Sequence, residues 1–122
     1  MTTLIKERRR RTLKIPGYKP TASKLLEAIC DVLGESIEDV TSNSRKGNLV
    51  KARAIYCYMG RMMRYKNREL AACLHKNTSN TQHHVRLYTY YMDDSKPWFR
   101  PELKEEIDTV RRRIQSRLNY CE

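Results

Sequence analysis

Glycine and proline are scarce in this sequence, with four residues of each among 122. So few of them exclude a collagen-like or linker-rich protein. Long apolar runs are missing as well: none approaches the roughly 18 residues that span a bilayer, so we expect no transmembrane helix. The arginine run at Arg8–Arg11 has no apolar stretch after it, so we also expect no secretory signal peptide.

Motifs that bind nucleotides are absent too. Neither the phosphate-binding pattern G-x-x-x-x-G-K-[ST] nor the dinucleotide-binding pattern G-x-G-x-x-G occurs in the chain. A chain of this length forms one modest core. The sequence therefore excludes the large ATPase folds and predicts a single domain.

Cysteine and histidine spacing gives no sign of a metal site. No C-x-x-C pair supplies the local clamp of a zinc finger, and no histidine pair at i, i+4 lies beside an acid. Three cysteines have apolar helical neighbours, which predicts free, buried thiols in the absence of a secretory signal. These three are Cys30, Cys57 and Cys73.

Catalytic constellations are also missing. The sequence shows no paired carboxylates placed for acid–base chemistry, no Ser–His–Asp order and no cysteine–histidine pairing. The tyrosines Tyr56, Tyr88 and Tyr91 fall at spacings typical of core packing. We therefore expect no enzyme activity, no small-molecule substrate, no cofactor and no metal.

Positive charge is abundant and unevenly placed. The net charge is +11, and ten basic residues face one acid, Glu69, between Asp39 and Asp93. The acids gather instead at Glu27–Asp39 and Glu102–Asp108. A basic middle with acidic flanks produces a directed field that attracts a polyanion.

Residues 1–20 are predicted to form a basic, flexible arm. They hold seven bases and one acid, and four of the bases are Arg8–Arg11. Pro16-Gly17 and Pro20 disfavour regular structure there. We expect this arm to follow the minor groove or the backbone of bound DNA.

Helical periodicity covers the rest of the chain. It predicts helices from Thr21 to Gly34, from about Asn48 to Arg64 and from Arg68 to Leu74, with a short turn of helix opening at Ser36. Two more are expected after these, one capped by Thr78 or Ser79 and one beginning at Arg100-Pro101. Asn67 is the expected cap of the short helix. The fold class is therefore all-α: a compact bundle of five to six helices, with a DNA-binding domain at 21–99 and a helix at 100–122 packing on it.

A short helix, a polar turn and a longer helix follow one another between Arg68 and Val85. This is the outline of a helix-turn-helix, whose second helix lies in the major groove with its N-terminal side chains at base edges. Asn or Gln there pairs with adenine through two hydrogen bonds, and Ser or Thr reaches base or phosphate. The second predicted helix supplies such side chains at Thr78, Ser79, Asn80, Gln82 and His83.

Several segments occur in an order shared with a known family. They are the apolar residues Leu25, Leu26, Ile29 and Val32, the turn Ser36–Ser42, the basic segment Arg45–Ala54, the apolar run Ile55–Met63, and Leu70, Ala71, Leu74, Thr81 and His84. From about Thr21 to Met92 the chain thereby resembles the C-terminal DNA-binding domain of the bacterial replication initiator, DnaA. The resemblance implies a Trp-repressor/DnaA C-terminal-like bundle, duplex DNA as partner, and an Arg53 that reaches the minor groove.

One segment departs from the family. Its signature turn reads R-D-H-T-T-V, whereas Asn77–Gln82 keeps only Thr81. The Arg, Asp and His that give the family its box specificity are missing, and so is the family's ATPase part. The resemblance therefore implies duplex binding without implying the standard initiator box.

The predicted interface joins the basic segment, the turn and the second helix. Lys46 and Lys51 are expected at phosphates, while His84 is expected to pack in the core. The full predicted set comprises Arg45, Lys46, Lys51, Arg53, Lys76, Asn77, Thr78, Ser79, Asn80, Thr81, Gln82, His83 and Arg86, with Arg8, Arg9, Arg10 and Arg11 of the arm.

Three functions are compatible with these patterns. The first is a sequence-selective duplex-DNA binder, cytoplasmic and nucleoid-associated, that acts in DNA replication or transcription regulation, for a phage or mobile element among others. The second is an RNA-binding or ribosome-associated protein, although an RNP-type aromatic platform and a G-X-X-G loop are lacking. The third is a structural or adaptor protein whose stripe at 103–118 pairs with a partner helix or a second copy.

Overall fold

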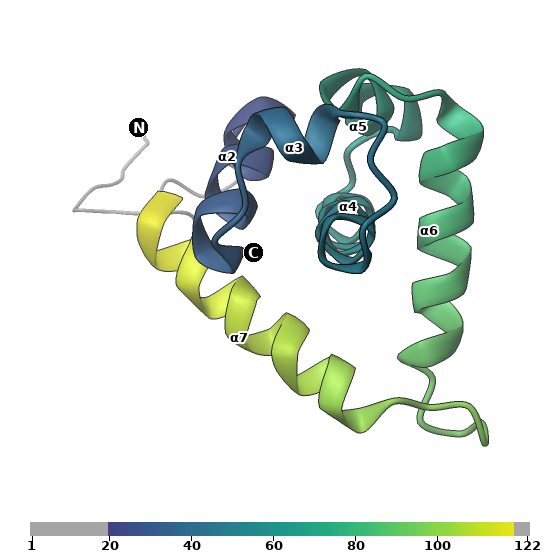
Figure 1. Cartoon of the computed structure of the whole chain (residues 1–122). Helices are drawn as coiled ribbons and strands as arrows, with labels where there is room; N and C mark the ends of the chain where they lie inside the picture. The colour runs from purple at the N-terminus through teal and green to yellow at the C-terminus, as the bar shows by residue number, and fades with distance from the viewer. Residues whose placement is uncertain (1–19, 119–122) are drawn as a thin grey trace, which may run out of the picture.

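The computed structural model describes residues 20–118, so the predicted arm, apart from Pro20, lies outside the described residues. Within this range the chain is helical and contains no strand, which confirms the all-α prediction (Figure 1). The helices are α2 (Ala22–Leu33), α3 (Ile37–Thr41), α4 (Gly47–Met62), α5 (Asn67–Leu74), α6 (Thr78–Tyr91) and α7 (Pro101–Leu118).

Helix α4 occupies the centre of the bundle, and the other helices surround it (Figure 1). Its residues Ile55, Tyr56 and Cys57 are wholly buried, because α2 and α3 pack on one side of it and α5 and α6 on the other. Gly60 allows α5 to approach closely, since a Cβ there would lie 2.4 Å from Leu70 Cδ2. Helix α6 therefore rests on α4 and α5 and leaves one face outward.

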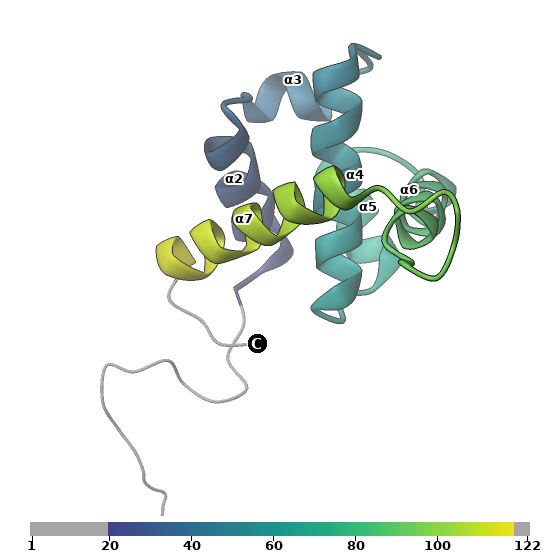
Figure 2. The same ribbon diagram turned by 90° about the horizontal axis from the view of Figure 1, so that it is seen from below.

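Helix α7 crosses α2 on the opposite side of the bundle from α5 (Figure 2). Its apolar stripe is buried in the same core as the stripe of α2. The stripe at 103–118 is therefore occupied within the chain and is not free to pair with a partner helix, contrary to the adaptor hypothesis. The buried residues of the stripe are Leu103, Ile107, Val110 and Ile114.

The helix ends follow the expected capping chemistry, with two corrections. Thr21 and Ser36 cap α2 and α3 as predicted. Helix α5 begins at Asn67 itself, because the Glu69 carboxylate accepts a hydrogen bond of 2.9 Å from the Lys66 N–H. Helix α6 is capped by Asn77 rather than Thr78 or Ser79. The Asn77 Oδ1 accepts from the Asn80 N–H at 3.0 Å, so the helix starts one residue earlier.

The turn between α5 and α6 depends on a strained residue. His75 has φ 59° and ψ 38°, in the left-handed region, where a side chain costs energy that glycine does not. We expect His75→Gly to raise the free energy of unfolding by about 0.5–1 kcal/mol. Urea denaturation checks this, with His83→Gly as control, because a glycine inside α6 should lower stability by about 1 kcal/mol. A loss of stability in His75→Gly would contradict the account.

The thiols agree in part with the prediction of free, buried cysteines. Cys30 and Cys57 are free and buried, whereas Cys73 is free and half-buried. Burial raises the pKa of the Cys30 thiol to about 11 and that of Cys57 to about 12. In the stretch from residue 20 to residue 118, no helix is long and apolar enough to cross a membrane.

Candidate nucleic-acid interface

The loop between α3 and α4 is held by the buried side chain of Arg53. Its Nε donates to the Val40 carbonyl oxygen at 2.7 Å, and its Nη1 donates to that of Ser44 at 2.7 Å. Nη2 donates to the carbonyl oxygens of Ser42 at 3.0 Å and Asp39 at 3.3 Å. These oxygens lie at and beyond the C-terminus of α3, where the helix dipole attracts a cation. Arg53 thus fixes the path of the loop.

This geometry corrects the prediction that Arg53 reaches into the minor groove. Only 5% of the residue is exposed, and its guanidinium faces the loop backbone inside the protein. An arginine has five N–H donors in a rigid fork, and four hydrogen bonds already run to this loop. Arg53 therefore positions the loop from within and does not meet DNA directly in this conformation.

Lys76, from the turn before α6, holds the same loop from the other side. Its Nζ donates to the Ser42 carbonyl oxygen at 2.6 Å and to that of Thr41 at 3.2 Å. Burial, and then the nearby Arg53, lowers the pKa of the Lys76 ammonium. The ammonium of Lys76, a residue predicted to contact DNA, thus binds the loop in this structure and ties the loop to the α5–α6 turn.

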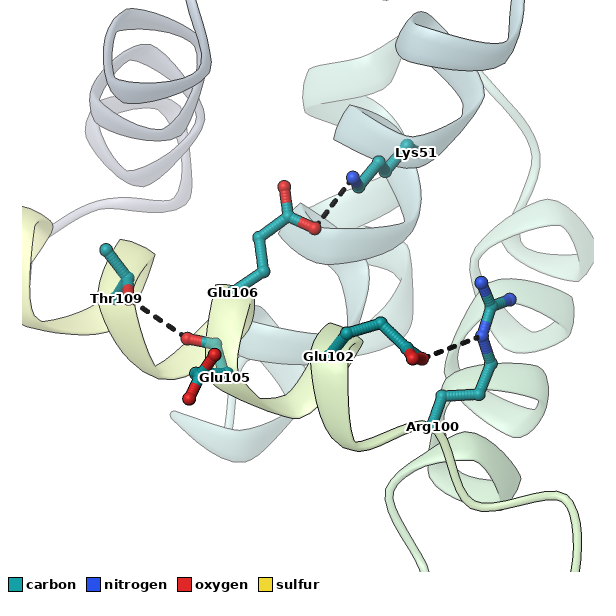
Figure 3. A network of polar contacts seen from close by, with 6 residues as sticks. All are labelled: Lys51, Arg100, Glu102, Glu105, Glu106 and Thr109. Carbon is teal, nitrogen blue, oxygen red and sulfur yellow. Dashed lines mark hydrogen bonds and ion pairs between the residues drawn. The ribbon is translucent and has the colours of Figure 1, made fainter.

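Lys51 is drawn away from the loop by α7. Its Nζ forms an ion pair of 2.6 Å with Glu106 Oε1, and its side chain points toward α7 (Figure 3). The pair is partly exposed, so it is worth less than about 1 kcal/mol. Lys51, which was predicted to contact phosphate, is thus directed toward Glu106 in this structure. Arg45 and Lys46 are the exposed cations of the loop.

The outer face of α6 carries four exposed polar side chains: Ser79, Gln82, His83 and Arg86. Their spacing of three, four and seven residues places them within an arc of about 100° on the helix. We call these four residues the α6 outer face. No acid occurs anywhere in α6, so nothing on this helix offsets the charge of Arg86.

Other predicted α6 residues face inward or serve the fold. Thr81 is wholly buried, so its predicted DNA contact is wrong. Its hydroxyl lies against Cys57. Burial raises the pKa of the Cys57 thiol, and the Thr81 hydroxyl offsets part of that rise. Asn80 is half-buried, and its amide oxygen Oδ1 is buried. Because pairing with adenine through two hydrogen bonds needs both the amide oxygen and the amide nitrogen, Asn80 does not make this contact in this conformation. Asn77 is the helix cap, and Thr78 is half-buried.

His84 is a core residue, as predicted, with 8% exposure. Burial, then His83 and Arg53, lowers the pKa of its imidazole, so the folded state favours the neutral ring. The unfolded chain binds a proton on His84 more readily than the folded protein does. The contribution of the buried neutral ring to folding stability is therefore present above about pH 6.5 and is lost as the pH falls. We expect urea denaturation at pH 7.5 and 5.5 to show a smaller acid-induced loss of stability in His84→Leu than in wild type. His83→Leu should give an intermediate loss, because it removes one of the lesser causes of the lowered His84 pKa and leaves the burial of His84 in place. Equal losses in all three would contradict this role.

The basic loop and the α6 outer face adjoin one another. A hollow of about 610 Å³ lies between the N-terminal half of α4, α6 and the first turns of α7. Arg45 from the loop and His83 from the α6 outer face both line it. The basic loop and the α6 outer face, which were predicted to belong to one interface, therefore border the same hollow.

Sequence reasoning missed two aromatic residues at the end of this surface. Tyr90 continues the α6 outer face one turn beyond Arg86 and is 51% exposed. Trp98, from the loop after α6, packs against it with ring centroids 5.9 Å apart. The signal for Tyr90 was its i+4 spacing from Arg86, whereas nothing in the local pattern places Trp98 beside it.

In comparisons with known proteins, no family model matches this chain and no curated sequence is significantly similar to it. Among residues 20–118, no group of three or more His, Cys, Asp or Glu side chains is placed to hold a metal ion.

Proposed function

We propose that this chain binds double-stranded DNA, with the α6 outer face in the major groove and the α3–α4 loop against the neighbouring backbone. The observation that carries the proposal is the α6 outer face itself: four exposed polar side chains on one side of a helix without acids, beside an exposed basic loop. The helix has 14 residues and is about 21 Å long, and a B-form major groove admits a helix.

The order of the elements supports this placement. Helix α5, the turn His75–Asn77 and α6 follow one another as in a helix-turn-helix, and α5 and α6 pack together. In such motifs the first helix braces against the backbone while the second enters the groove. The resemblance to the C-terminal domain of DnaA, read from the sequence, is in keeping with this arrangement and suggests a role in DNA replication or its regulation.

Five of the exposed side chains on this surface have a chemically suitable partner on duplex DNA. Gln82 has the amide that pairs with adenine, and Arg86 has the guanidinium that pairs with guanine. Ser79 suits a phosphate or a base edge, while Arg45 and Lys46 suit phosphates. The proposed reading residues are therefore Gln82 and Arg86, rather than Asn80 and Arg53.

A-form RNA is a poorer fit for the same surface. Its major groove is deep and narrow, so side chains of a helix do not reach the bases there. Duplex DNA is therefore the favoured partner.

The test is a titration followed by fluorescence anisotropy. Labelled random duplex DNA, an initiator-box duplex and the matched RNA duplex are each titrated at about 50 and 200 mM salt, since phosphate contacts make affinity fall steeply with salt. We expect tighter binding to DNA than to RNA and a steep salt dependence. Tighter binding to RNA, or no binding to any duplex at the lower salt, would overturn the proposal. A preference for the box duplex would show that the altered turn at 77–82 still recognises it.

A further inference from the structure

An aromatic corner lies where α6 ends. It consists of Tyr90 on α6 and Trp98 in the loop that follows, which are 51% and 46% exposed. Their rings meet edge to face, at an interplanar angle of 80°. Large exposed aromatic side chains that sit together on a polar surface are typical of a binding site.

The loop that presents Trp98 is held in a defined conformation. The Arg100 N–H donates to the Tyr91 carbonyl oxygen at 2.9 Å and so closes the loop onto α6. Asp93 accepts from the Ser95 N–H at 3.0 Å and from its hydroxyl at 2.6 Å, which shapes the first turn. The Lys96 Nζ lies 5.9 Å from the centre of the indole. The indole is therefore presented by a loop of defined conformation, with the Lys96 ammonium over one of its faces.

The corner continues the proposed DNA surface. Tyr90 continues the α6 outer face, eleven residues after Ser79 and about 16 Å along the helix from it. With the N-terminal part of α6 in the major groove, this distance puts the corner at the edge of the bound segment rather than over its bases. The ligand of the corner is therefore the part of the nucleic acid next to the duplex site.

The charge at the corner favours a base over a phosphate. Lys96 and Arg100 are exposed there, but Asp93 and Asp94 lie in the same loop and offset them. Hydrogen bonds from Ser95 lower the pKa of Asp93, so its carboxylate stays ionised. Stacking of a base on an aromatic ring needs no net charge, and every base has a face that stacks.

We propose that the Tyr90–Trp98 corner stacks an unpaired base of a single-stranded DNA extension, so that the chain prefers a duplex–single-strand junction to a blunt duplex. This inference rests on the proposed duplex binding, because the duplex site on α6 places the extension at the corner. It adds a second ligand, the unpaired base, to the one proposed for the α6 outer face.

The test uses the full chain, a blunt duplex, the same duplex with a short single-stranded extension at either end, and the single strand alone. Trp98 is the only tryptophan of the chain, so its emission reports stacking directly. We expect about tenfold tighter binding to one of the extended duplexes than to the blunt duplex. We also expect Trp98 emission to be quenched by that extended duplex and not by the blunt one.

Two variants separate stacking from general effects. Trp98→Ala should lower the affinity for the extended duplex to that for the blunt duplex and leave the blunt affinity unchanged, whereas Trp98→Phe should keep part of the preference. Equal affinities for blunt and extended duplexes, with unchanged Trp98 emission, would overturn this inference. The proposed duplex binding would still stand. A corner that binds a protein partner instead of a base would give this result. Binding of the single strand alone, with quenching and without duplex binding, would overturn the proposed function and leave the stacking site in place.

Discussion

Replacement of Arg53 by alanine is expected to lower the free energy of unfolding by about 3–5 kcal/mol, because each carbonyl oxygen that stays buried without its donor costs about 1–3 kcal/mol. Four carbonyl oxygens accept from the guanidinium, and none of these hydrogen bonds survives the truncation. The cation at the C-terminal end of α3 is lost as well. The loop that carries Arg45 and Lys46 would lose its main attachment to α4.

Urea denaturation measures this loss, and two further variants make it interpretable. Arg53→Lys keeps the charge but cannot donate in four directions, so its loss of stability should lie between those of wild type and Arg53→Ala. Arg86→Ala removes an arginine from the surface and should change stability by no more than about 0.5 kcal/mol. A stability of Arg53→Ala equal to that of wild type would show that the buried network does not hold the loop.

Replacement of Arg86 by alanine is expected to weaken duplex binding by about 1–3 kcal/mol, or roughly fivefold to more than a hundredfold. The reason is the position of the side chain at the centre of the α6 outer face, where a guanidinium pairs with a guanine edge. Because the residue is exposed, the fold should be unaffected. Gln82→Ala on the same face should change the preferred sequence more than the total affinity.

The control for Arg86→Ala is Arg113→Ala on α7. Both variants remove one exposed arginine, so both lower the net charge equally. Anisotropy titrations of the two with one duplex at fixed salt compare them directly. Equal effects would mean that only overall charge matters and would contradict a specific role for the α6 outer face.

Much of the fold is predictable from the sequence because its helices have clear apolar periods and standard caps. Thr21 and Gly34 bound α2 as expected, and Pro101 opens α7. The errors at α5 and α6 are shifts of one or two residues. They arise because Lys66 and Asn77, which precede the expected caps, make the capping contacts.

The candidate site was harder to predict, and Arg53 shows why. It lies in phase with the buried Leu49, four residues before it, and Tyr56, three residues after it, so the helical period itself places it inward. A basic residue in a basic segment was nevertheless interpreted as a DNA contact. The carbonyl oxygens that make its burial favourable come from a loop 9–14 residues earlier in the chain, and no local pattern shows where they point.

Thr81 and Trp98 illustrate two opposite errors: Thr81 was wrongly assigned to the DNA interface, and Trp98 was overlooked. Thr81 shares its helix face with His84 and Tyr88, both buried, yet the resemblance to a family motif assigned it to DNA. Trp98 meets Tyr90 only because the loop after α6 folds back onto that helix. Within a helix, apolar periodicity predicted burial better than the family resemblance did. Contacts made by a loop could be identified only in the structure.

The central claim is that the α6 outer face lies on duplex DNA, and backbone amide chemical shifts measured by NMR during a titration with a duplex test it most directly. We expect the largest shifts at Ser79, Gln82, His83 and Arg86, with further shifts at Arg45 and Lys46. Amides on the exposed side of α7, such as that of Arg113, should not move. Shifts that gather on α7 and leave α6 unchanged would contradict the account.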